Sequence, residues 1–118
     1  MKILICGDRN YSNYDKIVSI IKRLKDEEKE LIIIEGGASG ADELAKKASI
    51  ELEIEFREYK ADWKRYGRSA GPKRNQQMLD CESPELVIAF HENIEKSKGT
   101  KDMLNRASKA NIKTLLYS

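Results

Sequence analysis

The sequence predicts an α/β protein in which helices cover both faces of a parallel β-sheet. Short, unbroken apolar runs alternate along the chain with longer segments whose apolar residues recur at helical spacing. The runs are continuously apolar instead of alternating with polar residues, which indicates strands that are buried on both faces. Strands that alternate with helices in this way are typical of a parallel sheet.

The first half of the chain supplies three strands and two helices. A pattern similar to a capping box, Ser12-Asn13-Tyr14-Asp15, precedes the first helix, and Ile17, Ile20 and Ile21 follow on one face. The expected elements are a strand at residues 2–6, a helix at 14–28, a strand at 31–35, a helix at 40–52 and a strand at 53–59.

The second half begins with a segment that has no clear period, residues 60–71. This segment is longer than most connections in compact domains, and we expect it to form a flap that orders over a ligand. Pro72 suits the first turn of the helix that follows. The expected elements are a helix at 72–81, a strand at 85–90, a polar loop at 91–98, a helix at 99–110 and a strand at 112–117.

Right-handed crossovers between these strands favour a doubly wound, Rossmann-like three-layer sandwich with five parallel strands in the order 3-2-1-4-5. Ligands of such sheets bind beyond the carboxyl ends of the strands. Polar turns follow three of the strands there, at Gly7-Asp8-Arg9, Gly36-Gly37 and Phe90-His91. The fold therefore predicts a site assembled from turns that are distant in sequence.

The length and composition indicate one small domain. A chain of 118 residues is long enough for one domain with a core and too short for two, so we expect a single domain over residues 1–118. No apolar run is long enough for a membrane span, and the pattern of a signal peptide is missing. With only two cysteines, no disulfide framework is expected and the cytoplasm is the default location. The sequence is compatible with a homo-oligomer.

Basic residues are concentrated in one segment. The formal net charge is +2, but residues 57–74 contain seven basic and two acidic residues. This concentration points to an anionic partner. Tyr59, Trp63 and Tyr66 are interleaved with the basic residues, either to stack on a base or to form the apolar underside of a long loop.

The glycine turn, residues 36–40, is the strongest functional signal. It contains Gly36, Gly37, Ser39 and Gly40. A strand, a glycine-rich turn and a helix in this order aim backbone N–H groups and the positive end of a helix dipole at one point, which suits a phosphate or a carboxylate. The alternative is a turn without a ligand, capped by Ser39. The Asp42 side chain either hydrogen-bonds to a ribose hydroxyl of the ligand or only interacts favourably with the positive end of the helix dipole.

Two better-known phosphate motifs are not present. A P-loop ends in Gly-Lys-Ser/Thr, whereas the glycine turn continues as Gly40-Ala41-Asp42. The dinucleotide fingerprint G-x-G-x-x-G belongs after the first strand, where this chain reads Cys6-Gly7-Asp8-Arg9. Neither an ordinary NTPase nor an NAD enzyme is indicated, and no cofactor is expected. No zinc-ligand spacing occurs, so no metal site is expected either.

Two arginines and a second turn extend the expected site. Arg9 can bind a phosphate with two parallel hydrogen bonds, or can instead bridge to Asp8 at the surface. Arg74 lies in the first turn of a helix, where the dipole disfavours a cation, so it has no evident structural role. The turn at residues 97–100, Ser-Lys-Gly-Thr, opens another helix, and Thr100 either holds a phosphate or caps that helix.

As an ordered set these motifs resemble the SLOG superfamily, which includes the DNA-processing protein A proteins and the Lonely Guy cytokinin-activating phosphoribohydrolases. The chain is most similar to the small YpsA-related members, many of them bacterial or phage-borne. The matching motifs extend over nearly the whole chain and are Gly7-Asp8-Arg9, Gly36 to Asp42, Trp63 with Gly67, Ala70-Gly71-Pro72, Arg74-Asn75 with Met78, and Ser97 to Thr100.

The resemblance implies a Rossmann-like fold and a nucleotide or nucleotide-derived ligand, such as an ADP-ribose-like molecule or a nucleoside monophosphate. The expected ligand-binding residues are Gly7, Arg9, Gly36, Gly37, Ser39, Gly40, Asp42, Arg74, Asn75, Ser97, Gly99 and Thr100.

The chain departs from the phosphoribohydrolases at one position. Their Arg-Lys-x-x-Met motif is matched by Arg74 with Met78, but the last residue of their Pro-Gly-Gly-x-Gly-Thr-x-x-Glu motif falls on Met103. Asp102 is a poor substitute because neighbouring residues of a helix point about 100° apart. The missing glutamate argues against glycosidic cleavage and leaves binding intact, so Met103→Glu is expected to restore slow hydrolysis.

The sequence leaves three candidate functions open. The preferred one is binding of a nucleotide-type ligand by a sensor or sequestering protein. The first alternative is N-glycosidic hydrolysis of a nucleotide, with Arg74 and either Asp102 or Asp42 as catalytic candidates. The second is binding of single-stranded nucleic acid through the basic aromatic segment, against which the small overall charge argues.

Overall fold

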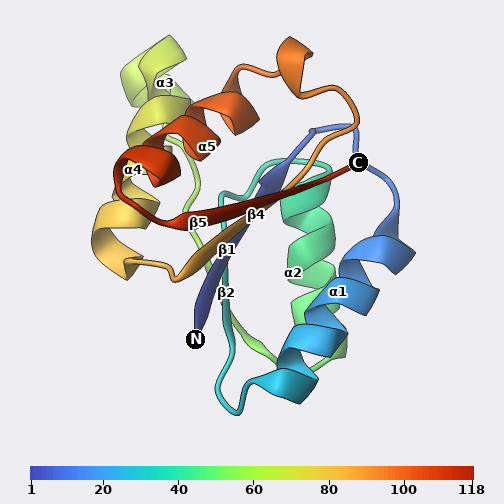
Figure 1. Cartoon of the computed structure of the whole chain (residues 1–118). Coiled ribbons are helices and arrows are strands. Elements are labelled where there is room, and N and C mark those ends of the chain that lie inside the picture. Colours follow the sequence, from blue (N-terminus) through green and yellow to red (C-terminus); the bar gives the residue numbers. More distant parts are fainter.

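One sheet of five parallel strands forms the centre of the molecule (Figure 1). The structure is a computed structural model and describes residues 1–118. The strands are β1 (Lys2–Gly7), β2 (Ile32–Glu35), β3 (Glu55–Glu58), β4 (Leu86–Phe90) and β5 (Lys113–Tyr117). Their order, β3-β2-β1-β4-β5, confirms the predicted Rossmann-like topology.

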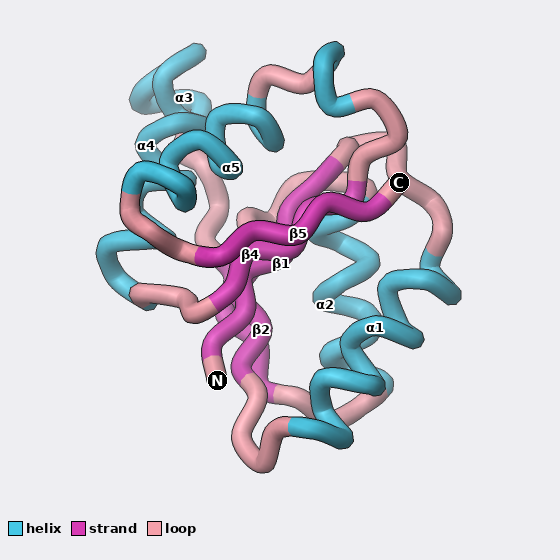
Figure 2. The backbone as a smooth tube through the Cα atoms, viewed as in Figure 1, coloured by secondary structure: helices cyan, strands magenta, loops and turns pink.

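The helices lie in two layers, one on each face of the sheet (Figure 2). They are α1 (Tyr14–Glu27), α2 (Ala41–Glu51), α3 (Trp63–Tyr66), α4 (Ala70–Glu82) and α5 (Gly99–Lys109), with two 3₁₀ turns, η1 (Gly67–Ser69) and η2 (Ile94–Lys96). α1 and α2 cover one face, and α4 and α5 cover the other (Figure 1). No helix in the chain combines the length and the apolar character that crossing a membrane requires.

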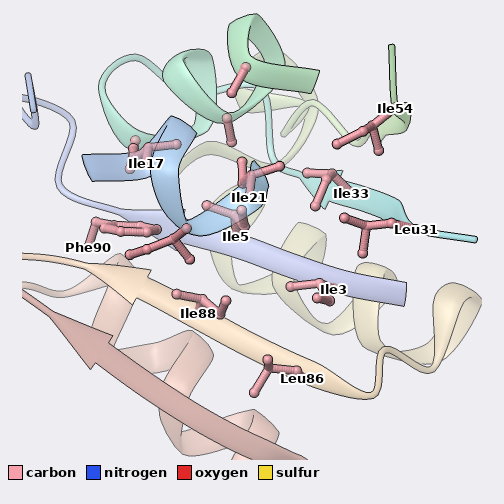
Figure 3. Close-up of a cluster of buried hydrophobic side chains, with 14 of the residues drawn as sticks. Ile3, Ile5, Ile17, Ile21, Leu31, Ile33, Ile54, Leu86, Ile88 and Phe90 are labelled. Carbon is pink, nitrogen blue, oxygen red and sulfur yellow. The ribbon is translucent and has the colours of Figure 1, made fainter. Parts of the chain in front are cut away.

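Each face of the sheet has its own apolar core, because successive side chains of a strand point to opposite faces. Ile3 and Ile5 of β1 join the core against α1 and α2, which Figure 3 shows. Leu4 joins the other core, against α4 and α5, where Met103 is fully buried. Burying each of these aliphatic side chains contributes roughly 1.5–3 kcal/mol.

α1 begins where an asparagine caps it. The side chain of Asn13 accepts a hydrogen bond from the N–H of Lys16 at 3.2 Å, and the first helical residue is Tyr14. The expected capping box would have placed Ser12 in this role. Asparagine and serine are comparable caps, so the sequence pattern alone did not separate them.

Residues 60–71 have more secondary structure than the sequence predicts. The segment contains α3 and η1, and α4 begins at Ala70, before Pro72. Asp62 caps α3, its carboxylate accepting a hydrogen bond from the N–H of Arg65 at 3.2 Å. A helix of four residues is too short to show an apolar period, which explains why the pattern did not reveal it.

Backbone pairing brings the polar turns to one edge of the sheet. Gly7 at the end of β1 is in register with Phe90 at the end of β4, and the N–H of Asp8 donates to the Phe90 carbonyl at 2.9 Å. On the other side of β1, the parallel strand β2 is in register with Leu4 opposite Ile34, so it ends at the same edge. The turns after β1, β2 and β4 therefore meet at the carboxyl edge.

Candidate functional site

A cleft of about 350 Å³, here called the main cleft, lies at the carboxyl edge of the sheet. One wall comes from the end of β1 and the start of α2, and the other from α4 and the turn that opens α5. The expected site residues that line it are Gly7, Arg9, Asp42, Arg74, Asn75, Ser97, Gly99 and Thr100.

A smaller cavity of about 250 Å³, here called the side chamber, adjoins the main cleft and shares Arg9, Ala38 and Arg74 with it. Three further expected residues line this chamber and not the main cleft. They are Gly36, Gly37 and Ser39. Lys60, Ala61 and Trp63 line the rest of the chamber. The glycine turn thus forms the wall of a second compartment.

Gly40 lines neither cavity. Its φ is +76°, and a Cβ at this position would overlap the carbonyl of Asp8 and the backbone of Arg9. The neighbouring N–H of Ala41 donates to the Asp8 carbonyl at 3.1 Å. Gly40 therefore allows the turn after β1 to pack directly on the start of α2, a conformation and a distance that favour glycine.

Two carboxylates occupy the N–H groups that the sequence assigned to a phosphate. The N–H of Gly37 donates to Oε1 of Glu35, and the N–H of Ala38 donates to Oδ2 of Asp42 at 3.2 Å. α2 has no side-chain cap at its N-terminus, so the alternative in which Ser39 caps the helix is wrong. Because two N–H groups of the turn are already paired within the protein, the arginines become the principal anion-binding groups of the site.

The two carboxylates are held away from solvent. Glu35 is fully buried, and this burial, together with the neighbouring Glu58 carboxyl, raises its pKa above the ordinary value. Asp42 is 6% exposed and lines the main cleft. Burial raises its pKa to about 6, against the opposing effects of the Ala38 N–H and the Arg74 charge. A fraction of the Asp42 carboxyl is therefore protonated near neutral pH.

Arg74 has a structural role that the sequence did not predict. Its Nη1 donates to the carbonyl oxygens of Gly36 and, at 3.4 Å, of Tyr59, and its Nε donates to Oδ1 of Asn75 at 3.1 Å. α4 begins at Ala70, so Arg74 lies in the second turn of this helix and not in the first turn that the sequence predicted. The guanidinium ties this second turn to the glycine turn and to the end of β3. Its Nη2 makes no hydrogen bond within the protein, which leaves donors for a ligand in the cavities that Arg74 lines.

Arg9 is the second arginine between the cavities. Its guanidinium lies over the Trp63 ring, 5.5 Å from the centroid, and not against Asp8. The Asp8 carboxylate instead accepts a hydrogen bond from the N–H of Asn10 at 3.0 Å. The alternative of an Arg9–Asp8 bridge is therefore wrong, and Arg9 is free of ionic partners.

Asp102 is directed to the interface of α4 and α5. Its Oδ2 accepts hydrogen bonds from Nδ2 of Asn75 at 3.0 Å and from Nε of Arg106 at 2.8 Å. It does not line the main cleft, whereas Asn75 does. Asp102 is therefore a structural partner of Asn75. Of the two carboxylates considered for catalysis, only Asp42 lies at the cleft.

A serine hydroxyl accepts a hydrogen bond in the turn that opens α5, whose N-cap residue, Lys98, makes no side-chain cap. Oγ of Ser97 accepts a hydrogen bond from the N–H of Thr100 at 3.0 Å, so Thr100 is not the cap. Thr100 is itself 5% exposed at the wall of the main cleft. Gly99 is the first residue of α5, and the positive end of this helix dipole therefore lies at the cleft.

The expected binding residues did not include several polar residues of the main cleft, although three of them belong to turns that the sequence placed at this edge. The residues not included are Asp8, Asn10, His91, Lys96 and Lys98. Lys96 ends the η2 turn, in a loop that the sequence described only as polar, and Lys98 lies in the turn at residues 97–100, of which only Ser97, Gly99 and Thr100 were expected to bind. With these two lysines, four cationic side chains line the cleft against the two carboxylates of Asp8 and Asp42. The cleft as a whole favours an anion.

The fold and the cleft define the class of this protein as a Rossmann-like α/β protein with a cationic cleft at the carboxyl edge of its sheet. Residues 1–66 match the family model YAcAr, described as the YspA, cpYpsA-related SLOG family, and the chain belongs to this family.

Two similar proteins extend the comparison over the whole chain. The Gene 61 protein of Mycobacterium phage D29 is 27% identical over 122 residues, which cover 98% of this chain and 95% of that protein. DNA processing protein A (DprA) from Streptococcus pneumoniae superposes with a TM-score of 0.78 at 18% identity. That match covers 98% of this chain and 49% of DprA, so the chain spans about half the length of that structure. The likeness to DprA shows the fold.

Proposed function

We propose that the protein binds a nucleotide or a nucleotide-derived anion, such as a nucleoside phosphate or an ADP-ribose-like molecule, as a sensor or sequestering protein. The observation that carries this proposal is the charge of the main cleft. Four cationic side chains, Arg9, Arg74, Lys96 and Lys98, line it. Membership of the SLOG family and the fold shared with DNA processing protein A support a role related to nucleotides or nucleic acids.

The groups around the cleft suit a phosphate in particular. Nη2 of Arg74 supplies donors in the fixed planar geometry that matches phosphate oxygens. The N-terminus of α5 adds the positive end of a helix dipole on the opposite wall. A volume of about 350 Å³ lies at the small end of the roughly 300–1,000 Å³ range of ligand pockets, which favours a ligand of mononucleotide size.

Calorimetric titration tests this function. Inorganic phosphate, AMP, GMP, ADP-ribose and the unphosphorylated nucleosides serve as probes, and we expect binding to require the phosphate. Arg9→Gln removes one cation that has no ionic partner in the protein, and should weaken binding about tenfold. Arg68→Gln is the matched control, because Arg68 is an exposed arginine outside both cavities. If the two variants bind the phosphorylated probes with equal affinity, the main cleft is not the binding site.

One observation favours a second function, N-glycosidic hydrolysis of a nucleotide. Asp42 is a buried carboxyl at the wall of the main cleft, and its pKa is raised to about 6. Carboxyls with such pKa values are often acid–base catalysts. Release of free base from AMP that is lost in Asp42→Asn and retained in Asp102→Asn would support it.

A further inference from the structure

We propose that the side chamber is the base-binding subsite, with the base of the ligand stacked on Trp63 and its phosphate held by Arg9 and Arg74. This inference rests on the proposed function and adds to it the position and the chemical class of the ligand. The ligand is then a nucleoside phosphate that extends through both cavities, and not a phosphate or a sugar phosphate alone.

The first argument is that the two cavities are neighbours. They share Arg9, Ala38 and Arg74, so the two arginines lie at their junction. The side chamber, about 250 Å³, is below the usual range for a complete ligand site but is ample for a flat ring system. A phosphate at the junction places the next groups of the same molecule in the chamber.

The second argument is the exposure of Trp63. Tryptophan is among the residues that are highly buried on average, yet Trp63 is 48% exposed and lines the side chamber. Its ring is nevertheless held in place. Arg9 lies over it at 5.5 Å, and a Cβ at Gly71 of α4 would come within 3.2 Å of Trp63 Cη2. A fixed, exposed indole is a stacking platform for a base.

The aromatic residues of this segment differ in what they contact. Tyr59 is a structural residue, because its hydroxyl donates to the buried carboxylate of Glu82. Tyr66 is exposed but, unlike Trp63, lines neither cavity, and its ring contacts the cationic groups of Arg65 and Lys73 at 5.1 and 4.9 Å. Trp63 is therefore a single platform. One platform suits one base, whereas a nucleic acid strand requires successive platforms.

The polar lining of the chamber suits the edge of a base. No acidic side chain lines it, and Arg9, Lys60 and Arg74 are its charged groups. The glycine turn contributes backbone and the exposed Ser39, whose hydroxyl makes no hydrogen bond within the protein. Backbone groups and a free hydroxyl provide both donors and acceptors beside the ring.

The experiment uses Trp63 as its own reporter, because it is the only tryptophan in the chain. AMP, GMP, CMP and UMP are titrated against the full chain, with ribose 5-phosphate as the probe without a base. We expect a nucleotide to quench the tryptophan emission and ribose 5-phosphate to bind without quenching. Trp63→Ala should weaken nucleotide binding about 5- to 100-fold by calorimetry and leave ribose 5-phosphate unchanged. Trp63→Phe should retain most of the affinity.

Tyr66→Ala is the matched control, an exposed aromatic outside both cavities, and should bind nucleotides as the wild type does. Nucleotide binding without quenching, and with equal affinity in Trp63→Ala, would overturn the base subsite and leave the proposed function standing. Binding of no phosphorylated probe would overturn both. Binding of a single-stranded oligonucleotide that needs Trp63 and Tyr66 alike, with a steep salt dependence, would replace the subsite with a nucleic acid surface.

Discussion

The Arg74 guanidinium donates a hydrogen bond to the carbonyl oxygen of Gly36, and so joins the second turn of α4 to the glycine turn. A Cβ at position 36 would lie 2.6 Å from Cζ of the same guanidinium. The absence of a side chain at Gly36 therefore determines where the cation between the two cavities can lie.

Gly36→Ala should displace the Arg74 guanidinium and weaken AMP binding. A hydrogen bond to a charged group contributes about 1.5–3 kcal/mol, so we expect a loss of about 10- to 100-fold by calorimetry. The displaced guanidinium also loses its hydrogen bonds to the carbonyls of Gly36 and Tyr59, so the free energy of unfolding should fall as well. Gly67→Ala, outside both cavities, is the control and should bind AMP with unchanged affinity. If Gly36→Ala binds AMP with unchanged affinity, the position of Arg74 does not contribute to ligand binding.

Gly40→Ala should destabilise the protein more than Gly67→Ala. The two glycines have similar backbone angles, φ 76° and ψ −125° at Gly40, φ 54° and ψ −132° at Gly67. Both variants therefore incur a strain of roughly 1–3 kcal/mol. Only at Gly40 does the new Cβ also meet backbone, that of Asp8 and Arg9, whereas nothing lies within 4 Å at Gly67. Urea denaturation measures the difference, and equal midpoints would show that the turn after β1 yields freely.

Met103→Glu should unfold the protein instead of creating a hydrolase. Met103 is fully buried in the core between the sheet and the helices α4 and α5, and does not reach the main cleft. The expectation that this variant restores hydrolysis is therefore abandoned. An uncompensated buried charge costs about 3–5 kcal/mol, whereas Met103→Leu should cost less than about 1.5 kcal/mol. Urea denaturation of both variants distinguishes these losses, and a stable Met103→Glu protein would contradict the burial.

The stability of Asp42→Asn relative to that of the wild type should increase as the pH rises. The folded-state pKa of Asp42, about 6, lies above its ordinary value of 3.8. The folded state thus binds the proton more tightly, and this contribution is complete below about pH 4 and is lost as the pH passes about 6. The free energy of unfolding of Asp42→Asn minus that of the wild type should increase by about 3 kcal/mol from pH 3 to pH 7. A difference independent of pH would mean that Asp42 is not desolvated.

The wild-type protein should bind AMP without releasing adenine. Stabilising the oxocarbenium-like state of glycosidic cleavage needs a carboxylate beside the sugar, and Asp102 is engaged by Asn75 and Arg106. Chromatography after a long incubation detects any free base. Robust release of adenine would show that the protein is a hydrolase, with Asp42 as the catalytic candidate.

The fold was predictable because it depends on local patterns and general rules of topology. Continuous apolar runs such as residues 31–34 identify buried strands, and right-handed crossovers restrict their order. The site was predictable only in part. The sequence shows that Arg74 and the glycine turn are present, but not that a hydrogen bond joins them across the fold, or that Glu35 and Asp42 satisfy the N–H groups of that turn. Such contacts depend on tertiary burial, which no local pattern records.

The two walls of the main cleft come from different halves of the chain, residues 6–42 on one side and residues 74–100 on the other. A ligand bound between the two walls contacts both halves of the chain, so it is released when the two halves separate on unfolding. Its binding energy is therefore added to the folding of the whole sheet, in proportion to the logarithm of its concentration. A higher concentration of such a ligand would therefore make the entire chain more resistant to proteases, and would not only fill one cleft.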